Sequence, residues 1–152
     1  MSWGPTVAPD APLLQVDGLH THLGGQWLHR GINFSIGRGE VVALIGGSGT
    51  GKSVLLRQCI GLTRPSQGSV KLFGDNICQM SRAQLNKVRS RYGVLFQEGA
   101  LFSSMTVAEN VAAPLNEHAN LPPRLRNELV AMKIRLAGLP ADAGSKRPSE
   151  LS

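Results

Sequence analysis

Residues 46–53 read Gly46-Gly47-Ser48-Gly49-Thr50-Gly51-Lys52-Ser53 and directly follow the apolar run 41–45. The spacing G-x-x-x-x-G-K-[ST] is typical of a loop whose backbone N–H groups point inward at phosphate oxygens. A helix that follows such a loop turns the positive end of its dipole toward the same anion. The stretch therefore predicts a phosphate-binding loop between a strand and a helix.

The last two residues of this loop have separate expected roles. Lys52 is expected to reach the β- and γ-phosphates of a nucleotide, and Ser53 is expected to offer its hydroxyl to Mg²⁺. The metal ion bridges those phosphates and neutralises charge as the terminal phosphate leaves. We therefore expect ATP or GTP, with Mg²⁺, as the ligand of residues 46–53.

A flexible glycine turn without a ligand is the alternative interpretation of the same residues. The flanking sequence argues against it, because the motif requires a strand before the loop and a helix after it. Residues 40–45 predict a short buried strand, and residues 52–60 predict a helix with no breaker before Gly61.

The composition excludes several classes of protein. The chain has 152 residues, about the length of one domain, and a formal net charge of +6. Its basic residues are dispersed, which favours a solvated surface over a nucleic-acid or membrane surface. We expect no secretory signal at the N-terminus, and the apolar runs are far shorter than the ~20 residues that span a bilayer. Cys59 and Cys78 lack ligand spacing and are expected to be reduced thiols in the cytoplasm.

The first half of the chain predicts a sheet built around the loop. Residues 1–12 predict a loose lead-in, and residues 13–19 and 27–36 predict two strands joined by a turn at Gly24-Gly25. The apolar face of the second strand is expected to come from Leu28, Ile32, Phe34 and Ile36. A further strand is expected over residues 69–73.

The second half predicts mostly helices. Ser81 and Thr106 each begin a capping box, and each is expected to start a helix; Pro114 is expected to end or kink the second of them. Residues 92–96 predict a compact strand between these helices.

A longer helix is expected to begin at Pro122-Pro123 and to stop before Gly138 and Pro140. Its apolar stripe is expected to pack in the core and consists of Leu125, Leu129, Met132 and Leu136.

Gln97 follows the predicted strand 92–96 and begins the run Gln97-Glu98-Gly99-Ala100-Leu101-Phe102. A glutamine here, downstream of a phosphate-binding loop, makes the sequence resemble the ATP-binding cassette (ABC) ATPases. The resemblance implies that Gln97 contacts Mg²⁺ and the attacking water, and that its loop touches the membrane subunit of a transporter.

The stretch from Phe96 to Val111, with Pro114-Leu115 and Glu117-His118 after it, is similar to the maintenance-of-lipid-asymmetry (Mla) ATPases. The segment 99–102 is the more specific part of this resemblance. It implies an ATPase for phospholipid trafficking that works as a homodimer, peripheral on the cytoplasmic face of the bacterial inner membrane. The implied partners are a permease subunit and, indirectly, a periplasmic lipid-binding component, and no nucleic acid is expected.

The resemblance also implies the fold, an α/β P-loop NTPase of ABC type with a sheet-rich nucleotide-binding core and a helical subdomain. The expected boundaries are a lead-in over 1–12, the core over 13–97, and the glutamine loop with a helical subdomain over 98–152. The C-terminal half of the core is expected to be missing, because Leu151-Ser152 matches only the start of the family signature Leu-Ser-Gly-Gly. A fragment of this kind is expected to hydrolyse little or no ATP alone.

One position departs from the family pattern. The aromatic residue on which these ATPases commonly stack adenine matches Leu23 here, and His22 or Trp27 could take its place. Two other functions stay open at this point: a soluble ABC-type ATPase that acts on nucleic acid, and a non-catalytic nucleotide-binding remnant.

Overall fold

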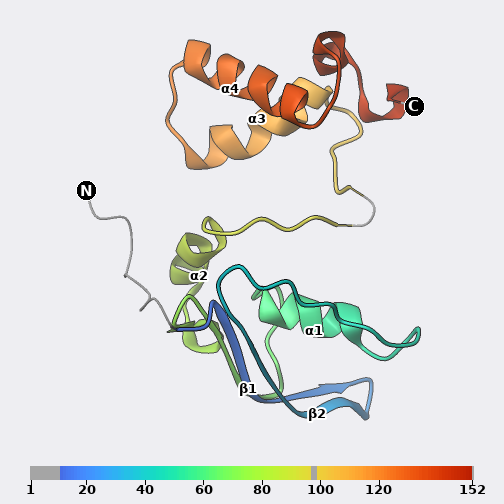
Figure 1. Cartoon of the computed structure of the whole chain (residues 1–152), viewed down its shortest axis with the longest axis vertical. Helices are drawn as coiled ribbons and strands as arrows, with labels where there is room; N and C mark the ends of the chain where they lie inside the picture. Colours follow the sequence, from blue (N-terminus) through green and yellow to red (C-terminus); the bar gives the residue numbers. More distant parts are fainter. Residues whose placement is uncertain (1–10, 97–98, 152) are drawn as a thin grey trace. The chain divides into compact units, whose positions relative to one another are not determined.

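A computed structural model describes residues 11–96 and 99–151. The chain divides into two compact units, Met1–Gly93 and Val94–Ser152. The first unit contains the strands β1 to β4 and the helices α1 and α2, and the second contains α3 and α4 (Figure 1).

The sheet of the first unit has the order β2-β1-β3-β4, with every neighbouring pair antiparallel. Its strands are β1 (Leu14–Leu23), β2 (Gln26–Ile36), β3 (Gln67–Leu72) and β4 (Asp75–Asn76). The predicted turn between the first two strands is confirmed: Gly24 and Gly25 have φ values of 58° and 80°. A two-residue hairpin turn needs this left-handed backbone at both positions, and glycine adopts it without a steric penalty.

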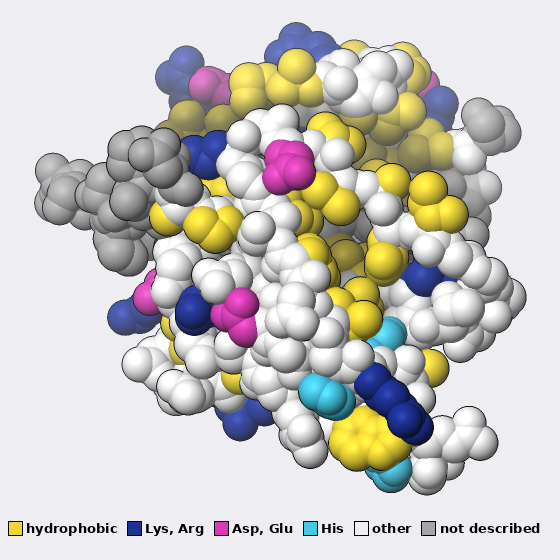
Figure 2. Space-filling view, turned by 60° about the horizontal axis from the view of Figure 1, so that its bottom comes forward, with side chains coloured by type: hydrophobic (Ala, Val, Ile, Leu, Met, Phe, Trp, Pro, Cys, Tyr) yellow, Lys and Arg dark blue, Asp and Glu magenta, His cyan; other side chains and the backbone are white. Residues whose placement is uncertain are grey.

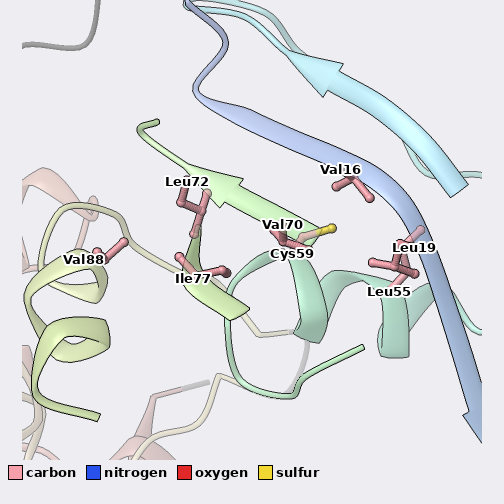
Figure 3. Close-up of a cluster of buried hydrophobic side chains, with 8 residues drawn as sticks. All are labelled: Val16, Leu19, Leu55, Cys59, Val70, Leu72, Ile77 and Val88. Carbon is pink, nitrogen blue, oxygen red and sulfur yellow. The ribbon is translucent and has the colours of Figure 1, made fainter. Parts of the chain in front are cut away.

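Helix α1 (Lys52–Cys59) lies against one face of this sheet, as predicted from the sequence after the loop. Figure 3 shows Leu55 and Cys59 of α1 directed toward Val16, Leu19 and Val70 of the strands. Burying an aliphatic side chain of this size contributes about 1.5–3 kcal/mol. The core therefore holds α1, and with it the end of the phosphate-binding loop, on the sheet.

The remaining members of this core come from β3, the short helix η1 (Ile77–Gln79) and α2 (Arg82–Arg89). They are Leu72, Ile77 and Val88 (Figure 3). The capping box predicted at Ser81 is confirmed, because its hydroxyl accepts from the N–H of Gln84 and the Gln84 side chain accepts from the N–H of Ser81.

The second unit consists of α3 (Val107–His118), α4 (Pro123–Leu136), η2 (Ala141–Ser145) and η3 (Pro148–Glu150). The capping box predicted at Thr106 is confirmed, with Glu109 as its reciprocal partner. Pro114 lies inside α3, so it does not end this helix. A small core is formed by Val107, Val130, Ile134 and Ala143.

Two predicted strands are wrong. Residues 40–45 and 92–96 contain no strand, and Val41, Ile45 and Leu95 are 97%, 90% and 94% exposed. A strand is defined by its hydrogen bonds to a neighbour. Among the described residues the sheet consists only of β2, β1, β3 and β4, and neither segment pairs with any of them.

The apolar stripe predicted for α4 is also wrong. The buried residues of this helix are Val130 and Ile134, whereas Leu125, Met132 and Leu136 are exposed. Successive residues of a helix are rotated by about 100°, so the buried face lies beside the predicted one. Small residues of α3 and η2, Ala108 and Ala143, allow close packing on the face that carries Val130 and Ile134.

Candidate functional site

The phosphate-binding loop is closed by hydrogen bonds from its own side chains. Lys52 Nζ donates to the carbonyl oxygens of Gly46 at 2.7 Å and Gly47 at 2.5 Å. Thr50 Oγ1 donates to Gly47 O at 2.9 Å. The ammonium group therefore lies within the curve of the loop, where a phosphate would meet a positive charge.

The N-terminus of α1 is open to an anion. Its N-cap residue, Gly51, provides no side-chain hydrogen bond, and its first turn contains no acidic residue. The first N–H groups of a helix have no intrahelical partner. In α2 and α3 the side chains of Ser81 and Thr106 satisfy such groups, whereas α1 leaves them for a ligand. Ser53 is exposed in this turn.

The other end of α1 is held by α2 and the residues after it. Arg89 Nη2 donates to Gly61 O at 2.6 Å, and Tyr92 Oη donates to Ile60 O at 2.5 Å. Burial raises the pKa of the Tyr92 hydroxyl, so it stays protonated and keeps its donor at neutral pH. The helix that carries Lys52 is thus anchored where it ends as well as along its length.

A buried polar cluster behind the loop was not predicted from the sequence. The residues expected to form the apolar face of β2 are half-buried, and the buried position of this strand is His29. Thr21 on β1 and Gln58 on α1 are buried with it. No motif or spacing marks these three residues, because they come close only when the hairpin and α1 pack together.

Cys59 of α1 is buried, and burial raises the pKa of its thiol to about 11. The thiolate is the reactive form of cysteine. Both cysteines are free, as expected from their spacing. Cys59 is therefore a core side chain and not a nucleophile of the site.

The residues considered for stacking on adenine lie at the tip of the hairpin. Leu23 is 62% exposed and Trp27 is 40% exposed. The indole of Trp27 meets the rings of His22 and His20 edge to face, with centroids 5.0 and 5.8 Å apart. Figure 2 shows histidine side chains gathered beside a large hydrophobic side chain at the lower end of its face.

Gln97, the remaining predicted site residue, lies outside the described residues. Within residues 11–96 and 99–151, no three His, Cys, Asp or Glu side chains cluster closely enough to hold a metal ion. The open N-terminus of α1, Lys52 inside the loop and the exposed hydroxyl of Ser53 nevertheless suit a nucleotide that brings Mg²⁺ on its phosphates. In the same part of the chain, no helix combines the length and apolarity needed to cross a bilayer.

The sequence matches the family model described as "ABC transporter" over residues 29–152. It is 39% identical over 140 residues to the intermembrane phospholipid transport system ATP-binding protein MlaF of Haemophilus influenzae, covering 92% of this chain and 53% of that protein. It is 43% identical over 129 residues to MlaF of Escherichia coli K12, covering 85% and 48%.

A similar identity, 39% over 154 residues, relates the chain to the probable ribonucleotide transport ATP-binding protein mkl of Mycobacterium tuberculosis H37Rv, covering 99% of this chain and 43% of that protein. The chain thus spans about half the length of the curated relatives that it matches.

Solved structures of ATP-binding cassettes have a similar fold. One is an ATP-binding cassette in a dimeric post-hydrolysis state bound to ADP and Pi, with a TM-score of 0.80 and 25% identity, covering 91% of this chain and 63% of that one. Another is cbiO1 from Clostridium perfringens, part of an ABC transporter complex, with a TM-score of 0.78 and 31% identity, covering 94% and 56%.

Proposed function

The chain belongs to the ABC transporter family, and from that premise we propose that it is the ATP-binding part of a transporter that couples ATP binding and hydrolysis to phospholipid trafficking. The observation that carries the proposal is the loop 46–53, which holds the Lys52 ammonium within its curve and ends at an uncapped helix N-terminus. Both features attract a chain of phosphates.

Different groups of the loop would bind different parts of the nucleotide. Backbone N–H groups at the start of α1 hold phosphate oxygens, while Lys52 exchanges a carbonyl partner for a phosphate oxygen. Ser53 would offer its hydroxyl to Mg²⁺, and Gln97 would orient the attacking water. Mg²⁺, when bound with ATP, neutralises the charge that develops on the transferred phosphoryl group.

The cargo is proposed from the segment Gly99-Ala100-Leu101-Phe102 and from the similarity to the MlaF proteins. The proposed partners are a membrane permease subunit and a second ATPase subunit, at the cytoplasmic face of the inner membrane. A ribonucleotide cargo is the second candidate, favoured by the similarity to the protein mkl.

Nucleotide binding is tested by calorimetric titration of the purified chain with Mg-ATP, beside Lys52→Ala. A hydrogen bond to a charged group contributes about 1.5–3 kcal/mol, so we expect Kd to rise roughly ten- to a hundredfold in the variant. Lys87→Ala, which removes an exposed lysine of α2, is the matched control and should bind like the unmutated chain. Failure of the unmutated chain to bind would contradict the proposal.

The cargo is tested in cells that carry Lys52→Ala in the chromosomal gene. Transfer of labelled phospholipid between the inner and outer membranes should slow, while uptake of labelled ribonucleotides should stay unchanged. The opposite pattern would favour ribonucleotide transport.

A further inference from the structure

Three buried polar side chains join the β1–β2 hairpin to α1 in the first unit. Thr21, His29 and Gln58 are 4%, 8% and 2% exposed. His29 Nδ1 lies 2.9 Å from Thr21 Oγ1, and Thr21 Oγ1 donates to Gln58 Oε1 at 2.9 Å. A hydrogen-bonded chain therefore runs from β2 through β1 to α1.

The direction of these bonds determines which nitrogen of His29 carries the proton. Thr21 has one hydroxyl hydrogen, which goes to Gln58, so its oxygen accepts from the imidazole. Nδ1 is consequently protonated, and Nε2 of the neutral ring carries a lone pair.

The Nε2 side of this ring lies against the phosphate-binding loop. A Cβ atom added to Gly51 would be 2.6 Å from His29 Nε2 and 2.8 Å from the side chain of Leu28. Gly51 is the N-cap of α1 and has a φ of 89°. The imidazole thus contacts the last loop residue before Lys52.

We propose that His29 is a positioning residue for the phosphate-binding loop. Held by Thr21 and Gln58, its neutral imidazole sets the place of Gly51, and thereby the place of the Lys52 ammonium and of the first N–H groups of α1. The inference rests on the proposed nucleotide-binding function of this loop and adds a residue behind the loop to those that line it.

Protonation of His29 would disturb this arrangement. It puts a second N–H and a positive charge beside the backbone of Gly51, where the lone pair of the neutral ring now lies. Burial lowers the pKa of His29 from its ordinary value of 6.5. Besides His29, the titratable or permanently charged side chains on β1, β2 and α1 are Asp17, His20, His22, Arg30, Lys52, Arg57 and Cys59.

The sign of the pH effect follows from the lowered pKa. The folded protein binds fewer protons at His29 than the unfolded chain, so folding is favoured above pH 6.5 and loses stability as the pH falls below it toward the folded pKa. Within the folded protein the ring is protonated, and its contact with Gly51 is disturbed, as the pH falls through this lowered pKa.

The first experiment measures the Kd of Mg-ATP from about pH 8 to pH 5.5 for three proteins: the unmutated chain, His29→Gln and His29→Leu. Glutamine can donate to Thr21 but does not titrate. We expect His29→Gln to match the unmutated chain at pH 8 and to bind more tightly than it at the acid end. We expect His29→Leu, which leaves Thr21 without its donor, to bind on the order of tenfold more weakly throughout.

The difference between the Gln variant and the unmutated chain is the readout, because nucleotide phosphates also titrate near this range. A purely structural role would leave that difference flat across pH. A flat difference, together with unchanged affinity in His29→Leu, would overturn the proposal. If circular dichroism shows that His29→Leu does not fold, two variants of Thr21 take its place. Thr21→Val removes the hydroxyl at constant shape and should bind Mg-ATP more weakly. Thr21→Ser keeps the hydroxyl and should bind like the unmutated chain.

A second readout needs no nucleotide. In NMR spectra of the unmutated chain, the Gly51 amide should shift with the same apparent pKa as the His29 ring, and this titration should vanish in His29→Gln. A Gly51 amide that does not follow His29 would contradict the inference while leaving the proposed function intact. Loss of Mg-ATP binding in the unmutated chain with a coupled Gly51 titration would instead contradict only the proposed function.

Discussion

The two flanks of the phosphate-binding loop differ in how they are held. The segment before it, 41–45, is apolar and rich in β-branched residues, yet it pairs with no described strand and Ile45 is 90% exposed. The segment after it, α1, buries Leu55 and Cys59 in the sheet core and is fixed at its end by Arg89 and Tyr92.

Apolarity and β-propensity do not by themselves bury a segment. Residues 41–45 contain three β-branched residues and β3 contains one, so 41–45 has the stronger strand propensity, but only β3 has a neighbour with which to exchange hydrogen bonds. In this structure the loop is therefore positioned from its C-terminal side, through α1, Gly51 and His29.

The free energy of unfolding should fall most when the packing of α1 on the sheet is weakened. Leu55→Ala leaves a cavity in the core between α1 and the sheet, and should lower the free energy of unfolding by about 2–5 kcal/mol in urea denaturation. Leu56→Ala, on the next residue and 52% exposed, is the matched control and should change it by under about 1 kcal/mol. Equal losses in both variants would show that α1 is not held by this core.

A smaller loss of stability is expected at Gly51, where the loop joins α1. Gly51→Ala meets both a left-handed backbone and the side chains of His29 and Leu28, and should cost about 2–4 kcal/mol of unfolding free energy. Gly49→Ala has a similar φ of 79° but no atom within 4 Å of its Cβ, so only the backbone strain of about 1–2 kcal/mol should appear. Thermal unfolding of both variants measures the difference in stability. If Gly51→Ala is no less stable than Gly49→Ala, the proposed contact between His29 and Gly51 does not position the loop.

The free energy of unfolding should change least for a substitution in residues 41–45. Ile45→Thr places a hydroxyl where the side chain is already in solvent, so the free energy of unfolding should change by no more than about 0.5 kcal/mol. Val70→Thr makes a comparable change in β3 at a fully buried position and should cost about 1–3 kcal/mol. If Ile45→Thr proves as costly as Val70→Thr in the same denaturation assay, the two flanks are held alike.

Local sequence signals predict the structure where the interactions are short-range. The hairpin at Gly24-Gly25, the capping boxes at Ser81 and Thr106 and the helix after the loop depend on residues a few positions apart. The buried face of a helix is predicted less well by its sequence: α4 packs through Val130 and Ile134, beside the predicted stripe. Which face of a helix is buried depends on the neighbour it meets, and the sequence of the helix alone does not contain that neighbour.

The loop 46–53, the helix after it and the family follow from the sequence alone, because the glycines, lysine and serine of the loop and the run 97–102 are local patterns that need no contact with a distant segment. That residues 41–45 form no strand, and that His29, Thr21 and Gln58 meet beside Gly51, follows only from the packed structure. Strand pairing and buried hydrogen bonds join residues far apart in the chain, so they exist only once the elements have packed.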